Sequence, residues 1–221
     1  MAILLTLLTF LLFISLSYFR SQRAEAATSP PRLWPVLRAP EMVREQGFDL
    51  PKGYCFHPGH TWMLDEGRQN ARVGLDSFAA NLLGKVDRVE VAGLNRWVRQ
   101  GQRLWTLTSD GFSVDMVSPV EGIVIAANPA VQQDPSLITK DPYGDGWILV
   151  VKSPDLATNL SNLLPAPFVR PWMQSTLDRL RALTTQLAPA LAQDGGLPVT
   201  GLLRRLEPGL QRRLAKEFFL S

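Results

Sequence analysis

Residues 106–124, TLTSDGFSVDMVSPVEGIV, decide the fold. Asp110 and Gly111 divide this stretch into two strand-like runs. An Asp-Gly pair between such runs is the strongest short-range signal for a β-hairpin, because a type I′ turn needs φ > 0 at both central residues. Pro119 ends the second strand, since proline has no N–H to donate to a ladder. The sequence therefore predicts a hairpin with Asp110-Gly111 at its tip.

Short strands and helices are predicted on both sides of this hairpin. Residues 71–75, 86–91, 123–127 and 148–151 read as strands. Residues 78–83 read as a helix that Asp76 or Ser77 can cap, with Gly84 suited to its C′ position. A short helix is expected from Gln133 to Ile138, after a turn at Asn128-Pro129. Residues 41–46 are expected to make one helical turn before Gly47.

Three motifs in this region resemble a known family. They are residues 73–86 (VGLDSFAANLLGKV), Ser118-Pro119-Val120, and the closing block at residues 141–147 (DPYGDGW). Together they resemble the H protein of the glycine cleavage system, over residues 54–164. The resemblance implies a barrel-sandwich hybrid, mainly β with short helices. It also implies a lipoyl carrier in which a lysine on the hairpin bears the lipoyl group.

The resemblance places a glycine where the family has its lipoylated lysine. Counting back from Ser118-Pro119-Val120, Gly111 falls on that lysine, and Thr108, Ser109 and Asp110 fall on the family's glutamate, serine and valine. The chain's lysines are Lys52, Lys85, Lys140, Lys152 and Lys216, so none lies at the hairpin. We therefore expect no lipoate and no other cofactor. Candidate interaction residues at the hairpin are Ser109, Asp110, Gly111 and Phe112.

The N-terminal residues 1–19 are almost wholly apolar, and Arg20 and Arg23 follow them at once. A helix of this length would roughly span a bilayer core of about 30 Å. The positive-inside rule then predicts a single-pass protein of the inner membrane with the bulk of the chain cytoplasmic. The alternative is a cleaved signal peptide and export, because Ala24-Glu25-Ala26 has the form of a cleavage site.

The remaining segments give the expected domain organisation. A Pro-rich linker at residues 20–49 precedes the H-like domain at residues 50–164. Residues 165–221 are expected to form an amphipathic helical tail, because apolar residues recur at helical spacing in two patterns. The first pattern is Met173, Leu177, Leu180, Leu187 and Leu191. The second is Leu203, Leu206, Leu210, Leu214 and Phe218. Two interpretations of the tail stay open: its helices dock on the domain or a partner, or the second, basic helix lies on the inner leaflet.

Composition and charge exclude several classes of function. The net charge is +3, but residues 54–164 hold nine basic and twelve acidic residues, so no basic face indicates nucleic-acid binding. Cys55 is the single cysteine and allows no internal disulfide. His57 and His60 lack the further ligands that zinc needs, so no metal site is expected. No nucleophile, acid–base or phosphate-loop pattern indicates an enzyme.

Three hypotheses for function follow. The first is a membrane-anchored, non-lipoylated H-like domain that serves as a protein-interaction or scaffold module, with a partner that the sequence does not identify. The second is a working lipoyl carrier in glycine cleavage or a related lipoate-dependent pathway. The third is a membrane-tethering protein, in which the N-terminal helix and the basic C-terminal helix do the main work.

Overall fold

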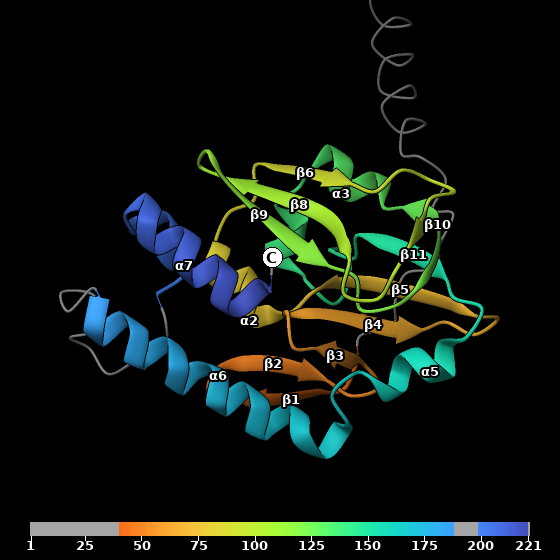
Figure 1. Cartoon of the computed structure of the whole chain (residues 1–221), viewed down its shortest axis with the longest axis horizontal. Helices are drawn as coiled ribbons and strands as arrows, with labels where there is room; N and C mark the ends of the chain where they lie inside the picture. The colour runs from red at the N-terminus through yellow and green to blue at the C-terminus, as the bar shows by residue number, and fades with distance from the viewer. Residues whose placement is uncertain (1–39, 188–198, 221) are drawn as a thin grey trace, which may run out of the picture. The chain divides into compact units, whose positions relative to one another are not determined.

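The computed structural model describes residues 40–187 and 199–220, which belong to one compact unit. The fold is mainly β with short helices, as predicted (Figure 1). The strands are β1 (Met42–Glu45), β2 (Phe48–Pro51), β3 (Cys55–His57), β4 (Thr61–Asp65), β5 (Asn70–Leu75), β6 (Arg88–Val91), β7 (Trp97–Val98), β8 (Arg103–Ser109), β9 (Phe112–Val117), β10 (Gly122–Ala127) and β11 (Leu149–Lys152). The helices are α2 (Ser77–Leu83), α3 (Pro129–Gln133), α4 (Leu137–Lys140), α5 (Leu156–Ser161), α6 (Ala166–Leu187), the 3₁₀ helix η2 (Leu202–Arg205) and α7 (Pro208–Phe219).

Two antiparallel sheets make up the centre of the fold. The larger has six strands in the order β3-β4-β5-β11-β10-β7, and the smaller has three in the order β6-β8-β9. Both contribute fully buried aromatic side chains, Trp62 from β4 and Trp105 from β8. Burying an aromatic side chain of this size dominates the energetics of a small core. Both sheets therefore contribute buried aromatic side chains that stabilise the same folded unit.

The predicted helix at residues 78–83 is confirmed as α2. The Asp76 side chain accepts a hydrogen bond from the Ala79 N–H, so Asp76 is the N-cap. Gly84 has φ 75° and donates its N–H to the Ala80 carbonyl, as expected of a glycine just after a helix. This helix lies beside the loop that leads to β6, and so helps to position the hairpin.

The predicted helical turn at residues 41–46 is wrong. Residues Met42–Glu45 form β1, which pairs with β2 in a separate two-stranded sheet. Gln46 (φ 45°) and Gly47 (φ 89°) make the two-residue turn between them. The physical reason is that a residue pair with positive φ matches the twist of a β-hairpin, so Gly47 closes a hairpin and does not end a helix.

The predicted helix from Gln133 to Ile138 is also wrong in its bounds. The side chain of Asn128 accepts a hydrogen bond from the Ala130 N–H and so caps α3. Pro129 follows in the first helical turn, where no N–H is needed. Pro135 lies between α3 and α4. Proline favours an extended conformation in the residue before it, which separates the two helices.

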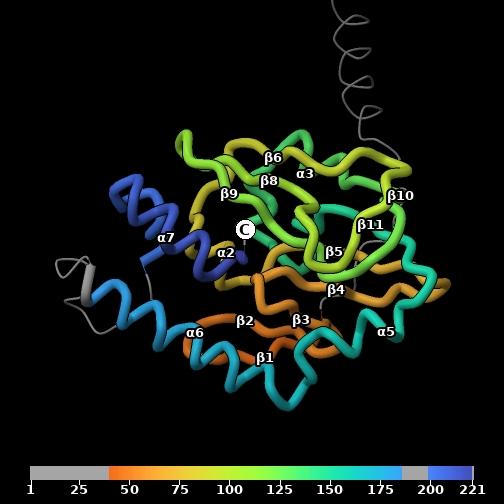
Figure 2. Tube along the Cα trace, viewed as in Figure 1, coloured from red at the N-terminus to blue at the C-terminus, as the bar shows by residue number. Residues whose placement is uncertain are grey.

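The C-terminal segment packs on the domain. Leu203 in η2 and Leu214, Phe218 and Phe219 in α7 are buried, and α7 contacts β9 (Figure 2). Pro208 begins α7, a position where its missing N–H needs no partner. Of the two interpretations of the tail, the structure supports docking, because the apolar face of α7 is occupied by the domain and is not available to a leaflet.

The predicted location in the inner membrane is corrected. Among the helices of residues 40–187 and 199–220, none is long and apolar enough to cross a bilayer. The apolar segment at residues 1–19, on which the anchor and the signal-peptide alternative were both based, lies outside the described residues.

Candidate functional site

The hairpin predicted from the sequence is present, formed by β8 and β9. Ser109 pairs with Phe112, which leaves Asp110 and Gly111 as the two turn residues. Their φ angles are 51° and 78°, both positive as a type I′ turn requires. In Figure 1 the hairpin tip points to the left, away from the six-stranded sheet's β10.

The four candidate residues differ in their accessibility. Asp110 and Gly111 are exposed, whereas Ser109 is buried and Phe112 is half-buried. A Cβ built on Gly111 would meet no atom within 4 Å, so the space beyond the tip is open. Phe112 is the first residue of β9 and is therefore less accessible than the two turn residues. Of the four candidates, Asp110 and Gly111 are the most accessible to another molecule.

Residues outside the hairpin hold its tip in place, and the sequence did not assign them to a site. The Asp110 N–H donates to Oδ2 of Asp87 at 2.8 Å, and the other carboxylate oxygen of Asp87 lies 2.7 Å from Nζ of Lys85. The hydrogen bond from Asp110, followed by that from Lys85, lowers the pKa of Asp87 below its ordinary value. These contacts join the loop after α2 to the hairpin turn.

The C-terminal segment also reaches the tip. Nη2 of Arg204, in η2, lies 3.9 Å from Oδ2 of Asp110. The tip is thus surrounded by two cations and two carboxylates, from Lys85, Arg204, Asp87 and Asp110. Sequence spacing could not have found this cluster, since Lys85, Asp110 and Arg204 meet only through the fold.

Neither histidine belongs to this cluster. Nδ1 of His60 lies 2.7 Å from Oδ2 of Asp76, and the ring is buried between Phe78 and Trp172. Nδ1 of His57 accepts the Gly59 N–H, and burial, followed by the nearby His60, lowers the pKa of His57 to about 4. In the part of the chain that the structure describes, no three His, Cys, Asp or Glu side chains are grouped as a metal site would need.

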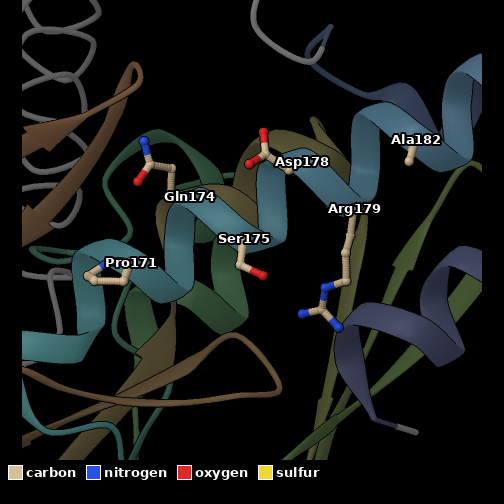
Figure 3. Close-up of a pocket in the computed structure, with 6 residues that line it drawn as sticks. All are labelled: Pro171, Gln174, Ser175, Asp178, Arg179 and Ala182. Atoms are coloured by element: carbon tan, nitrogen blue, oxygen red, sulfur yellow. The ribbon is translucent and has the colours of Figure 1, made fainter.

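A shallow hollow along α6 offers no catalytic chemistry (Figure 3). Its lining is Pro171, Gln174, Ser175, Asp178, Arg179 and Ala182. Asp178 is paired with Arg181, and Arg179 with Glu217 of α7. Both charges in the lining therefore have structural partners, and the hairpin tip remains the better candidate site.

Comparison with known proteins gives a consistent result. A family model described as glycine cleavage H-protein matches residues 54–174. A glycine cleavage system H protein of Thermus thermophilus is 35% identical over 118 residues, which are 53% of this chain and 91% of that protein. The one from Magnetococcus marinus is 32% identical over 126 residues, 57% of this chain and 89% of that protein. A crystal structure of the H protein from Mycobacterium marinum is 25% identical, with a TM-score of 0.49 over 57% of this chain and 98% of that one.

Proposed function

Because the chain belongs to the glycine cleavage H-protein family, we propose that it recognises a protein partner through the Asp110-Gly111 hairpin tip without carrying lipoate there. The family match covers more than half of the 221 residues. Since the family consists of lipoyl carriers, the expectation that the chain is not an enzyme is confirmed. The family carries lipoate, and whether this member does is part of the proposal.

The observation that carries the proposal is the open turn at Gly111. A glycine has neither the amine that forms the lipoyl amide nor a side chain that could swing a cofactor between partners. The turn is nevertheless fixed by Asp87, and Asp110 is contacted by Arg204. A surface that is already ordered before binding loses less entropy on association, so a rigid turn favours recognition.

Placing a lysine at the tip tests this proposal. Tagged protein is purified from its host after mild cross-linking, and its partners are compared between the wild type and Gly111→Lys. The matched control is Gly53→Lys, because Gly53 has a similar φ of 82° and equally open space around it. We expect Gly111→Lys to lose a partner that Gly53→Lys retains. Equal capture by both variants would exclude the hairpin tip from recognition.

The comparisons by themselves favour a second candidate function, that of a lipoyl carrier. All of the relatives named above are glycine cleavage system H proteins. The structure adds one observation in favour: Lys85, whose side chain is 63% exposed, pairs with Asp87, the residue that accepts the Asp110 N–H of the hairpin turn. An amine is therefore present beside the turn, although it comes from the loop after α2.

Mass spectrometry separates the two functions. The intact mass of protein from its own host, followed by peptide mapping, is compared for the wild type and Lys85→Arg. A lipoyl adduct on the wild type that disappears in Lys85→Arg would establish the carrier function and contradict recognition by an unmodified tip. An unmodified wild-type chain would leave recognition as the function of the hairpin.

A further inference from the structure

An exposed apolar pair lies on the six-stranded sheet, at the other end of β8 from the hairpin tip. Trp97 in β7 pairs directly with Ile123 in β10, and the two side chains are 44% and 39% exposed. Directly opposed residues in an antiparallel pair share one face of the sheet. Ile123 also pairs with Lys152 in β11, so Trp97, Ile123 and Lys152 form one outward-facing row.

This row ends at an open sheet edge. β7 is the last strand of the sheet. The Val124 N–H donates to the Arg96 carbonyl at 3.0 Å, so this carbonyl is directed toward β10, whereas the Arg96 N–H donates to the Gly93 carbonyl. Because the direction alternates along an antiparallel strand, the peptide groups of Trp97 are directed toward the open edge. An open edge offers hydrogen bonds to an added strand.

The charges around the row select the kind of partner. Arg96, Arg99 and Lys152 are all exposed, and within residues 40–187 and 199–220 none of them forms an ion pair. The acids nearest to the row along the chain are Glu121, which is half-buried just before β10, and Asp155, which is exposed three residues after Lys152. Three cations against two acids leave a net positive charge around the row.

Two occupants from this chain fit poorly. A second copy in a symmetric contact would bring the same cations together, and like charges across an interface cost affinity. The chain's own residues 1–39 contain four arginines and a single acidic residue, Glu25, so they would also repel this surface. The occupant must combine negative charge with apolar side chains.

We propose that Trp97, Ile123 and the open edge of β7 form a docking surface for an acidic, extended segment of another protein, with Arg96, Arg99 and Lys152 contacting its carboxylates. Trp and Arg are the residues most enriched among those that contribute strongly to binding. The surface is independent of the hairpin tip, because the seven residues of β8 separate the two by roughly 20 Å.

A pair of synthetic peptides tests the proposal on the full chain. Each is about seven residues long, the length of a typical strand, with valine alternating with glutamate in one and with lysine in the other. Fluorescence anisotropy of the labelled peptides gives their dissociation constants. We expect the glutamate peptide to bind at least tenfold more tightly than the lysine peptide. Trp97→Ala should weaken this binding about tenfold, the effect of removing an important aromatic contact.

Matched variants distinguish specific binding at this site from nonspecific binding of the peptide elsewhere on the protein. Phe168→Ala removes an aromatic side chain that is 61% exposed on α6, and it should leave peptide binding unchanged. The double variant Arg96→Gln/Arg99→Gln should reduce both the affinity and its dependence on salt. The proposal is overturned if the two peptides bind equally, if Trp97→Ala binds like the wild type, or if Trp97 is needed instead for self-association or for binding to anionic lipid vesicles.

Discussion

His57 shows how burial sets the chemistry of a single residue in this fold. Its ring is mostly buried and its Nδ1 accepts a hydrogen bond from the Gly59 N–H, which favours the neutral imidazole. Burial lowers the pKa of His57 from 6.5 to about 4. The unfolded chain therefore binds this proton more readily than the folded chain does.

We expect His57 to make the free energy of unfolding depend on pH. Its contribution is fully present above pH 6.5 and is lost as the pH falls from 6.5 to about 4, because the unfolded state is protonated first. NMR titration should show the imidazole of His57 charging near pH 4. In urea denaturation, His57→Gln should lose less stability than the wild type over the same pH interval. Titration of the His57 imidazole near pH 6.5 would contradict the expectation that burial lowers its pKa.

Asp87 gives a second expectation at this scale, on the hairpin tip. The pKa of its carboxyl is lowered chiefly by the hydrogen bond from the Asp110 N–H. A group with a lowered folded pKa stabilises the fold above its unfolded pKa, and this effect is lost as the pH falls through the lowered value. Hydrogen exchange of the Asp110 amide should thus be slow at neutral pH and accelerated in Asp87→Asn. Equal exchange in the two proteins would show that Asp87 does not hold the turn.

The sequence could identify Gly111 but not its surroundings. The register of the Asp-Gly turn is a local property, and both of its φ angles are as predicted. The burial of Ser109 and the partial burial of Phe112 depend on what covers the hairpin. No pattern along the chain shows that Arg204 lies beside Asp110, since almost a hundred residues separate them.

At the level of elements, α2 and η2 approach closely through two glycines. A Cβ on Gly84 would lie 2.5 Å from Cα of Gly201, so these backbones touch where the C-terminal segment meets the domain. The Gly201 N–H also donates to the Asn81 carbonyl at 2.8 Å. This contact positions η2, and with it the Arg204 that faces the hairpin tip.

Alanine at Gly84 should therefore destabilise the protein more than alanine at Gly111. Both glycines have φ near 75°, where a side chain costs about 1–2 kcal/mol. Only Gly84→Ala adds a backbone clash, worth about 1–3 kcal/mol more. Chemical denaturation of both variants measures the difference. Equal losses of stability would mean that the α2–η2 contact is loose.

Elements with a strong local signal were predictable, and those that depend on a choice between two local options were not. The β8–β9 hairpin and the capped helix α2 each follow from a specific turn or cap residue. Gly47 is compatible with the end of a helix and with a hairpin turn, and only the pairing of Val43 with Leu50 decides for the hairpin.

For the whole molecule, the C-terminal segment is part of the core of the fold. Periodic leucines predicted that α7 has an apolar face, but periodicity does not say what covers that face. The structure shows that Phe218 packs against Phe78 of α2, with ring centroids 5.4 Å apart, and that the His60 ring lies 6.3 Å from it. The segment beyond the resembling region therefore contributes to the stability of the region itself.

We expect Phe218→Ala to destabilise the entire domain and not only α7. Phe218 is 1% exposed, and truncating a buried phenylalanine costs about 3–5 kcal/mol, a large part of a typical total of about 5–15 kcal/mol. Guanidinium denaturation should show a lower midpoint with one transition and an unchanged slope, because α7 and the sheets unfold together. The matched control is Phe168→Ala, which removes an exposed ring from α6 and should change the stability by less than about 0.5 kcal/mol. A separate early transition in Phe218→Ala, with the main midpoint unchanged, would mean that α7 is an appendage and that the sheets form a complete core without it.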